Sequence, residues 1–138
     1  MKPTSDKVFL DTNIIVYAHT DLEPDKQKTA QKLIAEYQTI ISTQVLQETA
    51  NTLVKKFKHS WLNVSKVAAE AIQNNLLHIN TDATILEAFR IAERYGFSFY
   101  DSLIISAALE CGCNILYSED MHHGQLIENR LKIVNPFI

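Results

Sequence analysis

The chain is poor in the residues that interrupt regular structure, since only three glycines and three prolines occur among 138 residues. This composition leaves little room for linkers, and the sequence contains no low-complexity tract and no internal repeat. Long apolar runs are missing too, so no segment is long enough to cross a bilayer. We therefore expect one globular domain over residues 1–138, with no membrane partner.

Cysteine is nearly absent, and the two that occur, Cys111 and Cys113, are separated by a single residue. This spacing disfavours a disulfide between them, and two thiols do not complete a four-ligand zinc site. The N-terminal stretch MKPTSDK is polar and lacks the apolar core of a signal peptide. Reduced thiols without a leader indicate a cytoplasmic protein.

An excess of basic residues, the usual sign of a nucleic-acid-binding domain, is also missing. The chain has 13 Lys and Arg against 16 Asp and Glu, a formal net charge of −3. The total charge is misleading if several acids bind metal ions. Without four such acids, 13 basic and 12 acidic residues remain, and the rest of the surface is nearly neutral. The total charge therefore does not decide whether the chain binds nucleic acid.

Short apolar strands alternate with amphipathic helices along the chain. Strands are expected at 8–11, 39–43, 76–79, 114–118 and 132–135. Helices are expected at 13–19, 25–37, 44–58, 63–75, 82–95 and 99–111. The alternation predicts an α/β fold, a three-layer α/β/α sandwich around a parallel sheet of four to five strands. In such sheets the functional crevice lies at the carboxyl ends of the strands.

The same pattern makes predictions about individual helices. Gly96 and Gly112 are expected to end the last two helices, because glycine readily adopts the left-handed conformation of a helix end. Thr43 is expected to cap the helix at 44–58, and Ile72 to lie on the buried stripe of the helix at 63–75.

Two acids lie at the carboxyl ends of expected strands. Asp11 is the last residue of the first strand, and Asp120 follows the fourth strand with Glu119 beside it. If these parallel strands are neighbours, the two carboxylates converge at one edge of the sheet. The structural alternatives are an N-cap of the next helix for Asp11 and a polar turn for Asp120.

Two further acids lie on helices. Glu48 points away from the apolar face of its helix, so its polar stripe either faces solvent or borders the crevice. Asp101 shares a helix face with Ile104 and Ile105, which must be buried. A partly desolvated carboxylate there needs a backbone N–H, a cation or a proton, and Ser98-x-x-Asp101 also fits a capping box.

Four acids gathered at one edge of a sheet repel one another unless divalent cations hold them. Ligand sets made only of oxygen suit Mg²⁺ or Mn²⁺ rather than zinc. The sequence therefore predicts a metal site made by Asp11, Glu48, Asp101 and Asp120.

Four motifs, in this order, resemble those of PIN-domain ribonucleases: VFLDTNIIVYA, STQVLQETANTL, FSFYDSLIISAAL and LYSEDMHHGQ. The resemblance extends from about Val8 to Pro136, and the size of the chain is similar to the VapC toxins of type II toxin–antitoxin pairs. It implies a Mg²⁺- or Mn²⁺-dependent endoribonuclease whose four acids are both catalytic and metal-binding. It also implies an RNA substrate, a cognate antitoxin and a homodimer.

The resemblance also implies supporting residues. Thr12 and Asn13 match small polar residues after the first acid, and Ser118 matches a family Ser or Thr two residues before the last acid. Because that last region varies within the family, Glu119 is a candidate substitute for Asp120.

Positive charge for RNA is concentrated at the end of the Glu48 helix, in Lys55, Lys56 and Lys58. These lysines either contact phosphates or only cover a solvated helix end, where they also suit the helix dipole.

Other families fit the acids less well. A phosphatase of the haloacid dehalogenase type needs a second Asp two residues after the first, where this chain has Asn13. A two-component receiver needs an Asp on a middle strand, and TIIST and LLHIN contain none. A catalytically idle PIN-fold module, either RNA-binding or a scaffold, stays open as the alternative, although all four acids are present.

Overall fold

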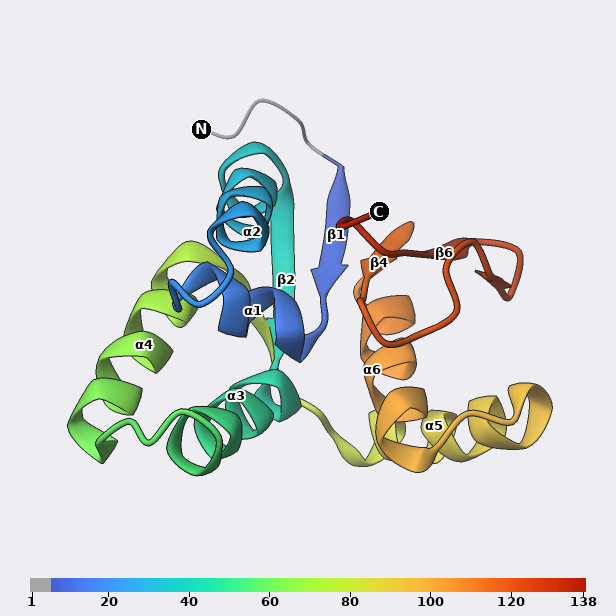
Figure 1. The fold of residues 1–138 in the computed structure, drawn as a ribbon. Helices are drawn as coiled ribbons and strands as arrows, with labels where there is room; N and C mark the ends of the chain where they lie inside the picture. Colours follow the sequence, from blue (N-terminus) through green and yellow to red (C-terminus); the bar gives the residue numbers. More distant parts are fainter. Residues whose placement is uncertain (1–5) are drawn as a thin grey trace.

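The computed structural model describes residues 6–138, so the polar N-terminal stretch expected to lack a signal peptide lies mostly outside the described residues. Residues 6–138 form a six-stranded sheet and six helices (Figure 1). The strands are β1 (Lys7–Leu10), β2 (Gln38–Ser42), β3 (Leu76–His78), β4 (Ile115–Tyr117), β5 (Leu126–Ile127) and β6 (Leu131–Val134). The helices are α1 (Thr12–Ala18), α2 (Pro24–Glu36), α3 (Thr43–Lys55), α4 (Trp61–Asn74), α5 (Asp82–Tyr95) and α6 (Phe99–Glu110).

The strands follow the order β3-β2-β1-β4-β6-β5, and every pairing is parallel except that of β5 with β6. Helices α1 to α4 lie on one face of the sheet and α5 with α6 on the other (Figure 1), as expected if the crossovers have the usual right hand. The predicted α/β class and parallel sheet are confirmed. The two-residue strand β5 was not expected, because it is too short to show an apolar pattern.

Strand β1 is the centre of the sheet. Val8 pairs with Thr39 of β2 on one side and with Ile115 of β4 on the other. Phe9 is also completely buried, as expected for a parallel strand with helices on both faces. The carboxyl ends of β1 and β4 therefore lie side by side, which is the condition under which Asp11 and Asp120 were predicted to converge.

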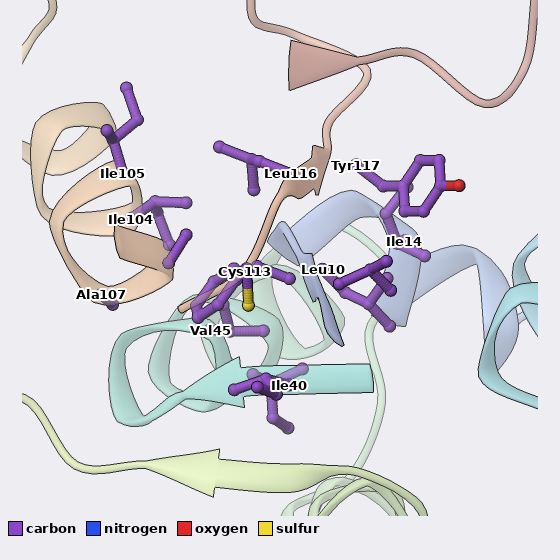
Figure 2. Packing of buried hydrophobic residues seen from close by; sticks show 14 of the residues in the cluster. Leu10, Ile14, Ile40, Val45, Ile104, Ile105, Ala107, Cys113, Leu116 and Tyr117 are labelled. Atoms are coloured by element: carbon purple, nitrogen blue, oxygen red, sulfur yellow. The ribbon is translucent and has the colours of Figure 1, made fainter. Parts of the chain in front are cut away.

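Helix α6 is buried around its whole circumference over residues 102–109, which are apolar except for two serines. Figure 2 shows Ile104 and Ile105 among the packed side chains between this helix and Leu116 of β4. A helix surrounded by close packing on all sides cannot rotate without opening cavities. The position of its first turn, which contains Asp101, is therefore fixed by the core.

Both predicted helix stops are confirmed, since Gly96 caps α5 in the left-handed conformation and α6 ends before Gly112. The prediction that Thr43 caps α3 was wrong. Ser42 accepts the capping hydrogen bond from the Val45 backbone, while the Thr43 hydroxyl accepts one from Asn80 N.

The predicted stripe of α4 was too wide. Ile72 is 47% exposed, whereas Val64, Val67 and Ala71 are buried. The neighbouring helix α3 covers only the narrower stripe.

The two cysteines are free thiols, as expected. Burial raises the pKa of the Cys113 thiol to about 12 and also raises that of Cys111. Thiols that remain protonated are weak nucleophiles and weak metal ligands, so these two act as small packing residues. Within residues 6–138 no helix is long and apolar enough to span a membrane.

Replacing Phe9 by Ala should reduce the free energy of unfolding by about 3–5 kcal/mol, because it leaves a cavity at the centre of the sheet. The matched control is Phe89→Ala on α5, where the ring is 54% exposed and the loss should stay below about 1 kcal/mol. Urea unfolding followed by circular dichroism measures both. Equal losses in the two variants would contradict the central position of β1.

Candidate active site

A cleft of about 180 Å³ opens at the carboxyl edge of the sheet, where β1, α3, α6 and the loop after β4 meet. The residues that line it are Asp11, Thr12, Asn13, Glu48, Thr52, Asp101 and Asp120. All four predicted acids thus come together in one place, although they are separated by up to 109 positions in the sequence. A larger cleft of about 380 Å³ between α1, α2 and α4 contains a single carboxylate, Glu70, and lacks this concentration of charge.

Asp11 is fixed by the pairing of β1 with β4. Its backbone N–H donates to the Tyr117 carbonyl at 3.0 Å, which extends the strand ladder by one residue. The Ser118 hydroxyl donates to Asp11 Oδ2 at 2.8 Å, and the Thr12 backbone donates to Oδ1 at 2.7 Å. Asp11 is therefore the N-cap of α1 as well as a cleft residue, so the two interpretations of this acid do not exclude each other.

Each small polar residue near the first acid holds a different carboxylate. The Thr12 hydroxyl donates to Glu48 Oε1 at 2.8 Å. The Asn13 side-chain amide donates to Asp120 Oδ2 at 2.8 Å. The first turn of α1 thus orients acids from α3 and from the β4 loop, and these distant partners could not be read from the local sequence.

Asp101 lies in the first turn of α6. Ser98 is the N-cap of this helix and accepts a hydrogen bond from Asp101 N at 3.2 Å, so the capping role expected for Ser98 is confirmed. The positive end of the helix dipole favours a negative charge at this position. Asp101 also lines the cleft, at the rim of the buried face formed by the rest of the helix.

Glu119 has a different environment from its neighbour Asp120. It does not line the cleft. Its carboxylate accepts a hydrogen bond from Tyr17 Oη at 2.6 Å and forms an ion pair with Lys26 Nζ at 2.5 Å. The structure therefore orients Asp120 toward the four-acid cleft and Glu119 toward α1 and α2.

The charges of the four cleft acids are not balanced by any cationic side chain in the described part of the chain. Among residues 6–138, none of the four forms an ion pair with Lys, Arg or His. Burial raises the pKa of Asp11 to about 6, with further increases from the charges of Glu48 and Asp101 and opposing hydrogen bonds from Ser118 and Thr12.

The pKa of Asp101 is shifted in the same direction as that of Asp11. Burial raises the pKa of Asp101, the negative charge of Asp120 raises it further, and a hydrogen bond with Ser98 opposes the increase. Both shifts show that the protein alone disfavours the ionised form of these acids. A cation in the cleft would reverse this preference.

The donors around the cleft are carboxylate, hydroxyl and amide groups, a set that suits a hard cation such as Mg²⁺ or Mn²⁺. In the described part of the chain, no three His, Cys, Asp or Glu side chains are already close enough to enclose an ion. Mg²⁺ usually contacts only one or two carboxylates and keeps several waters, so an open arrangement of acids fits it.

One cleft residue was not proposed from the sequence. Thr52 lies four residues after Glu48 on α3 and therefore on the same helix face. The four-residue spacing from Glu48 along the polar stripe of α3 is the sequence feature from which Thr52 could have been predicted. Lys55 and Lys56 continue the stripe and are exposed, whereas Lys58 lies beyond the helix with a positive φ of 59° and is also exposed.

A family model described as PIN domain matches residues 8–126. No curated protein sequence matches the chain significantly. The chain is similar in structure to Mycobacterium tuberculosis VapC20, described as a toxin that cleaves the sarcin-ricin loop. The TM-score is 0.66 at 22% identity, covering 82% of this chain and 89% of that one.

The chain is also similar to VapBC2 from Rickettsia felis, determined in complex with a DNA fragment from its promoter. The TM-score is 0.67 at 18% identity, covering 94% of this chain and 99% of that one. At such identities the two likenesses establish the shared fold.

Asp11→Asn should stabilise the metal-free protein. The pKa of Asp11 in the folded state, about 6, is above its ordinary value of 3.8, so wild-type stability falls as the pH rises through this range. The variant should therefore gain about 2 kcal/mol in free energy of unfolding at about pH 8, and the gain should shrink toward zero near pH 4. Denaturant unfolding with a chelator measures the difference. A variant that is less stable than wild type at about pH 8 would contradict the conclusion that burial disfavours the charged form of Asp11.

Proposed function

Because the chain belongs to the PIN-domain family, we propose that it is a metal-dependent endoribonuclease that hydrolyses RNA phosphodiester bonds. The observation that supports this most directly is the cleft of four carboxylates that no cationic side chain among residues 6–138 neutralises. Such a cleft has high affinity for a divalent cation and repels an unaccompanied phosphate.

The roles of the acids follow from their positions. Asp11 and Asp101 are the proposed inner metal ligands, because both are desolvated and held by fixed backbone elements. Glu48 and Asp120 complete the shell or orient the attacking water, and each is already aligned by one side-chain hydrogen bond. Bound Mg²⁺ or Mn²⁺ would neutralise charge at the phosphate and lower the pKa of a coordinated water.

The biological setting is proposed from the relatives. One structural neighbour is described as an RNA-cleaving toxin and the other as a VapBC2 complex on promoter DNA. We propose that residues 1–138 act as a single PIN-like domain, as the toxin of a type II toxin–antitoxin pair. Its partners would be a cognate antitoxin that blocks the cleft and a second copy in a homodimer.

The purified protein, free of any partner, should cleave RNA with Mg²⁺ or Mn²⁺ and not with EDTA. Asp101→Asn should reduce the rate by about 10²-fold or more, because it removes a charge from the proposed metal site. Glu110→Gln at the exposed end of the same helix should cleave like wild type. Gel analysis of RNA products measures all three.

Either of two results would contradict this function. Folded, partner-free protein that cleaves none of a panel of transfer, ribosomal and messenger RNAs would favour a catalytically idle module. Cleavage that persists in EDTA and in the Asp101→Asn variant would indicate a mechanism that does not use the carboxylates, or a contaminating nuclease.

The lysines at the end of α3 should contribute to RNA affinity. Changing Lys55, Lys56 and Lys58 to Gln should reduce the dependence of log affinity on log salt by roughly 0.7 for each phosphate that the protein no longer neutralises. Neutralising Lys28 and Lys32, exposed on α2, is the control and should leave the slope unchanged. Binding to single-stranded RNA without divalent metal measures the slope. The same slope in both variants would assign these lysines to a solvated helix end.

A further inference from the structure

The Glu119 carboxylate is the centre of a compact cluster beside the cleft. Its two oxygens have different partners, Tyr17 Oη for Oε1 and Lys26 Nζ for Oε2. Lys26 Nζ also approaches Tyr17 Oη at 3.4 Å, which closes a triangle of one acid, one phenol and one ammonium group. Burial alone would raise the pKa of Glu119, but the hydrogen bonds from Lys26 and Tyr17 and the charge of Lys26 outweigh it and lower the pKa.

Aromatic rings enclose the ammonium group. Lys26 Nζ lies 4.9 Å from the centre of the Tyr17 ring and 5.5 Å from that of Phe137. The two rings pack edge to face, with centres 5.2 Å apart. The side chains of Lys26 and Glu119 are only 29% and 21% exposed, so this ion pair is less screened than a surface pair.

The cluster and the cleft share one short piece of chain. Ser118 donates to Asp11, Glu119 accepts from Tyr17, and Asp120 accepts from Asn13. Three consecutive residues after β4 are therefore fastened to the end of β1 and to α1.

The spacing on α1 explains how both acids are held. Asn13 and Tyr17 are four residues apart and lie on one face of the helix, where they hold Asp120 and Glu119 respectively. Glu119 and Asp120 are consecutive residues of a bend directly after β4. Because Ser118 on one side is hydrogen-bonded to Asp11, holding the Glu119 side chain restricts the backbone from which Asp120 projects. Holding Glu119 against α1 and α2 therefore sets the direction in which Asp120 projects.

We propose that Lys26 and Tyr17 are positioning residues for the metal site. They retain Glu119 outside the cleft and thereby hold the backbone of residues 118–120 so that Asp120 lines it. They also neutralise a fifth carboxylate next to four that already repel one another. The inference rests on the proposed function, because it assumes that the cleft binds a divalent metal.

The test is the affinity for Mn²⁺, measured by calorimetry on the full chain, together with kcat and KM for RNA cleavage. Lys26→Met should weaken Mn²⁺ binding about tenfold, as loss of a group that orients a metal ligand does, and should reduce kcat with KM little changed. Lys26→Arg, which keeps the charge, should restore most of the affinity. Lys28→Met, two residues away on the exposed side of α2, should bind Mn²⁺ like wild type.

Two milder variants cover the case in which Lys26→Met does not fold. Tyr17→Phe removes one hydroxyl and keeps the ring, and should weaken Mn²⁺ binding about threefold. Glu119→Gln should weaken Mn²⁺ binding less than Asp120→Asn does. When Glu119→Gln is already present, adding Lys26→Met should weaken Mn²⁺ binding little further, because both changes break the same ion pair.

Three results would overturn the inference. Unchanged Mn²⁺ affinity in both Lys26→Met and Tyr17→Phe would reduce the cluster to a packing feature. A raised KM with unchanged Mn²⁺ affinity in Lys26→Met would make Lys26 a contact for RNA instead. If wild type itself neither binds Mn²⁺ nor cleaves RNA, the proposed function fails and this inference fails with it.

Discussion

The crowding of four carboxylates in one partly buried cleft is the constraint on which the rest of this structure depends. No cationic side chain among residues 6–138 pairs with these acids, and burial together with neighbouring charges raises the pKa of both Asp11 and Asp101. A site of this kind costs stability in the folded protein and persists only where the surrounding elements are rigid. The β1–β4 pairing and the fully buried helix α6 provide that rigidity.

Three small polar residues each orient one of the cleft acids through a hydrogen bond. Thr12, Asn13 and Ser118 orient Glu48, Asp120 and Asp11 respectively. Thr12 and Asn13 lie in the first turn of α1, directly after β1, and Ser118 directly follows β4, the strand that pairs with β1. The topology thus supplies both the acids and the groups that align them, before any metal is bound.

No positively charged side chain of the described residues lines the cleft. Lys26 is engaged with Glu119, and Arg90 and Arg94 are engaged with Glu128 on the other side of the sheet. Lys55 and Lys56 remain exposed at the end of the helix that contributes Glu48. An acidic centre with basic groups at its margin suits a substrate that carries phosphates and meets its metal within the site.

The fold could largely be predicted, because apolar strands alternating with amphipathic helices have few compact solutions. The meeting of Asp11 and Asp120 could be predicted only conditionally, since it requires β4 to pair with β1 rather than with β3, its predecessor in the chain. The local pattern places Glu48 on a polar stripe but does not say that Thr12, 36 positions away, holds it.

The choice between Glu119 and Asp120 could not be made from the sequence. The two are chemically similar neighbours in a loop, where no periodicity distinguishes them. Their different orientations depend on Lys26, which is 93 positions away in the sequence, and on Asn13. The N-cap of α3 was predicted wrongly for a related reason. Ser42 and Thr43 are both favourable N-cap residues, and the local sequence does not show that Asn80 N donates to the Thr43 hydroxyl.

The most direct test of the central claim is anomalous diffraction from a crystal of the protein soaked in Mn²⁺. The account predicts a manganese peak in the cleft, in contact with Asp11 and Asp101, with waters completing the coordination shell. A crystal at the same Mn²⁺ concentration that shows the cleft acids ordered and no manganese among them would contradict the claim that these carboxylates form a metal site.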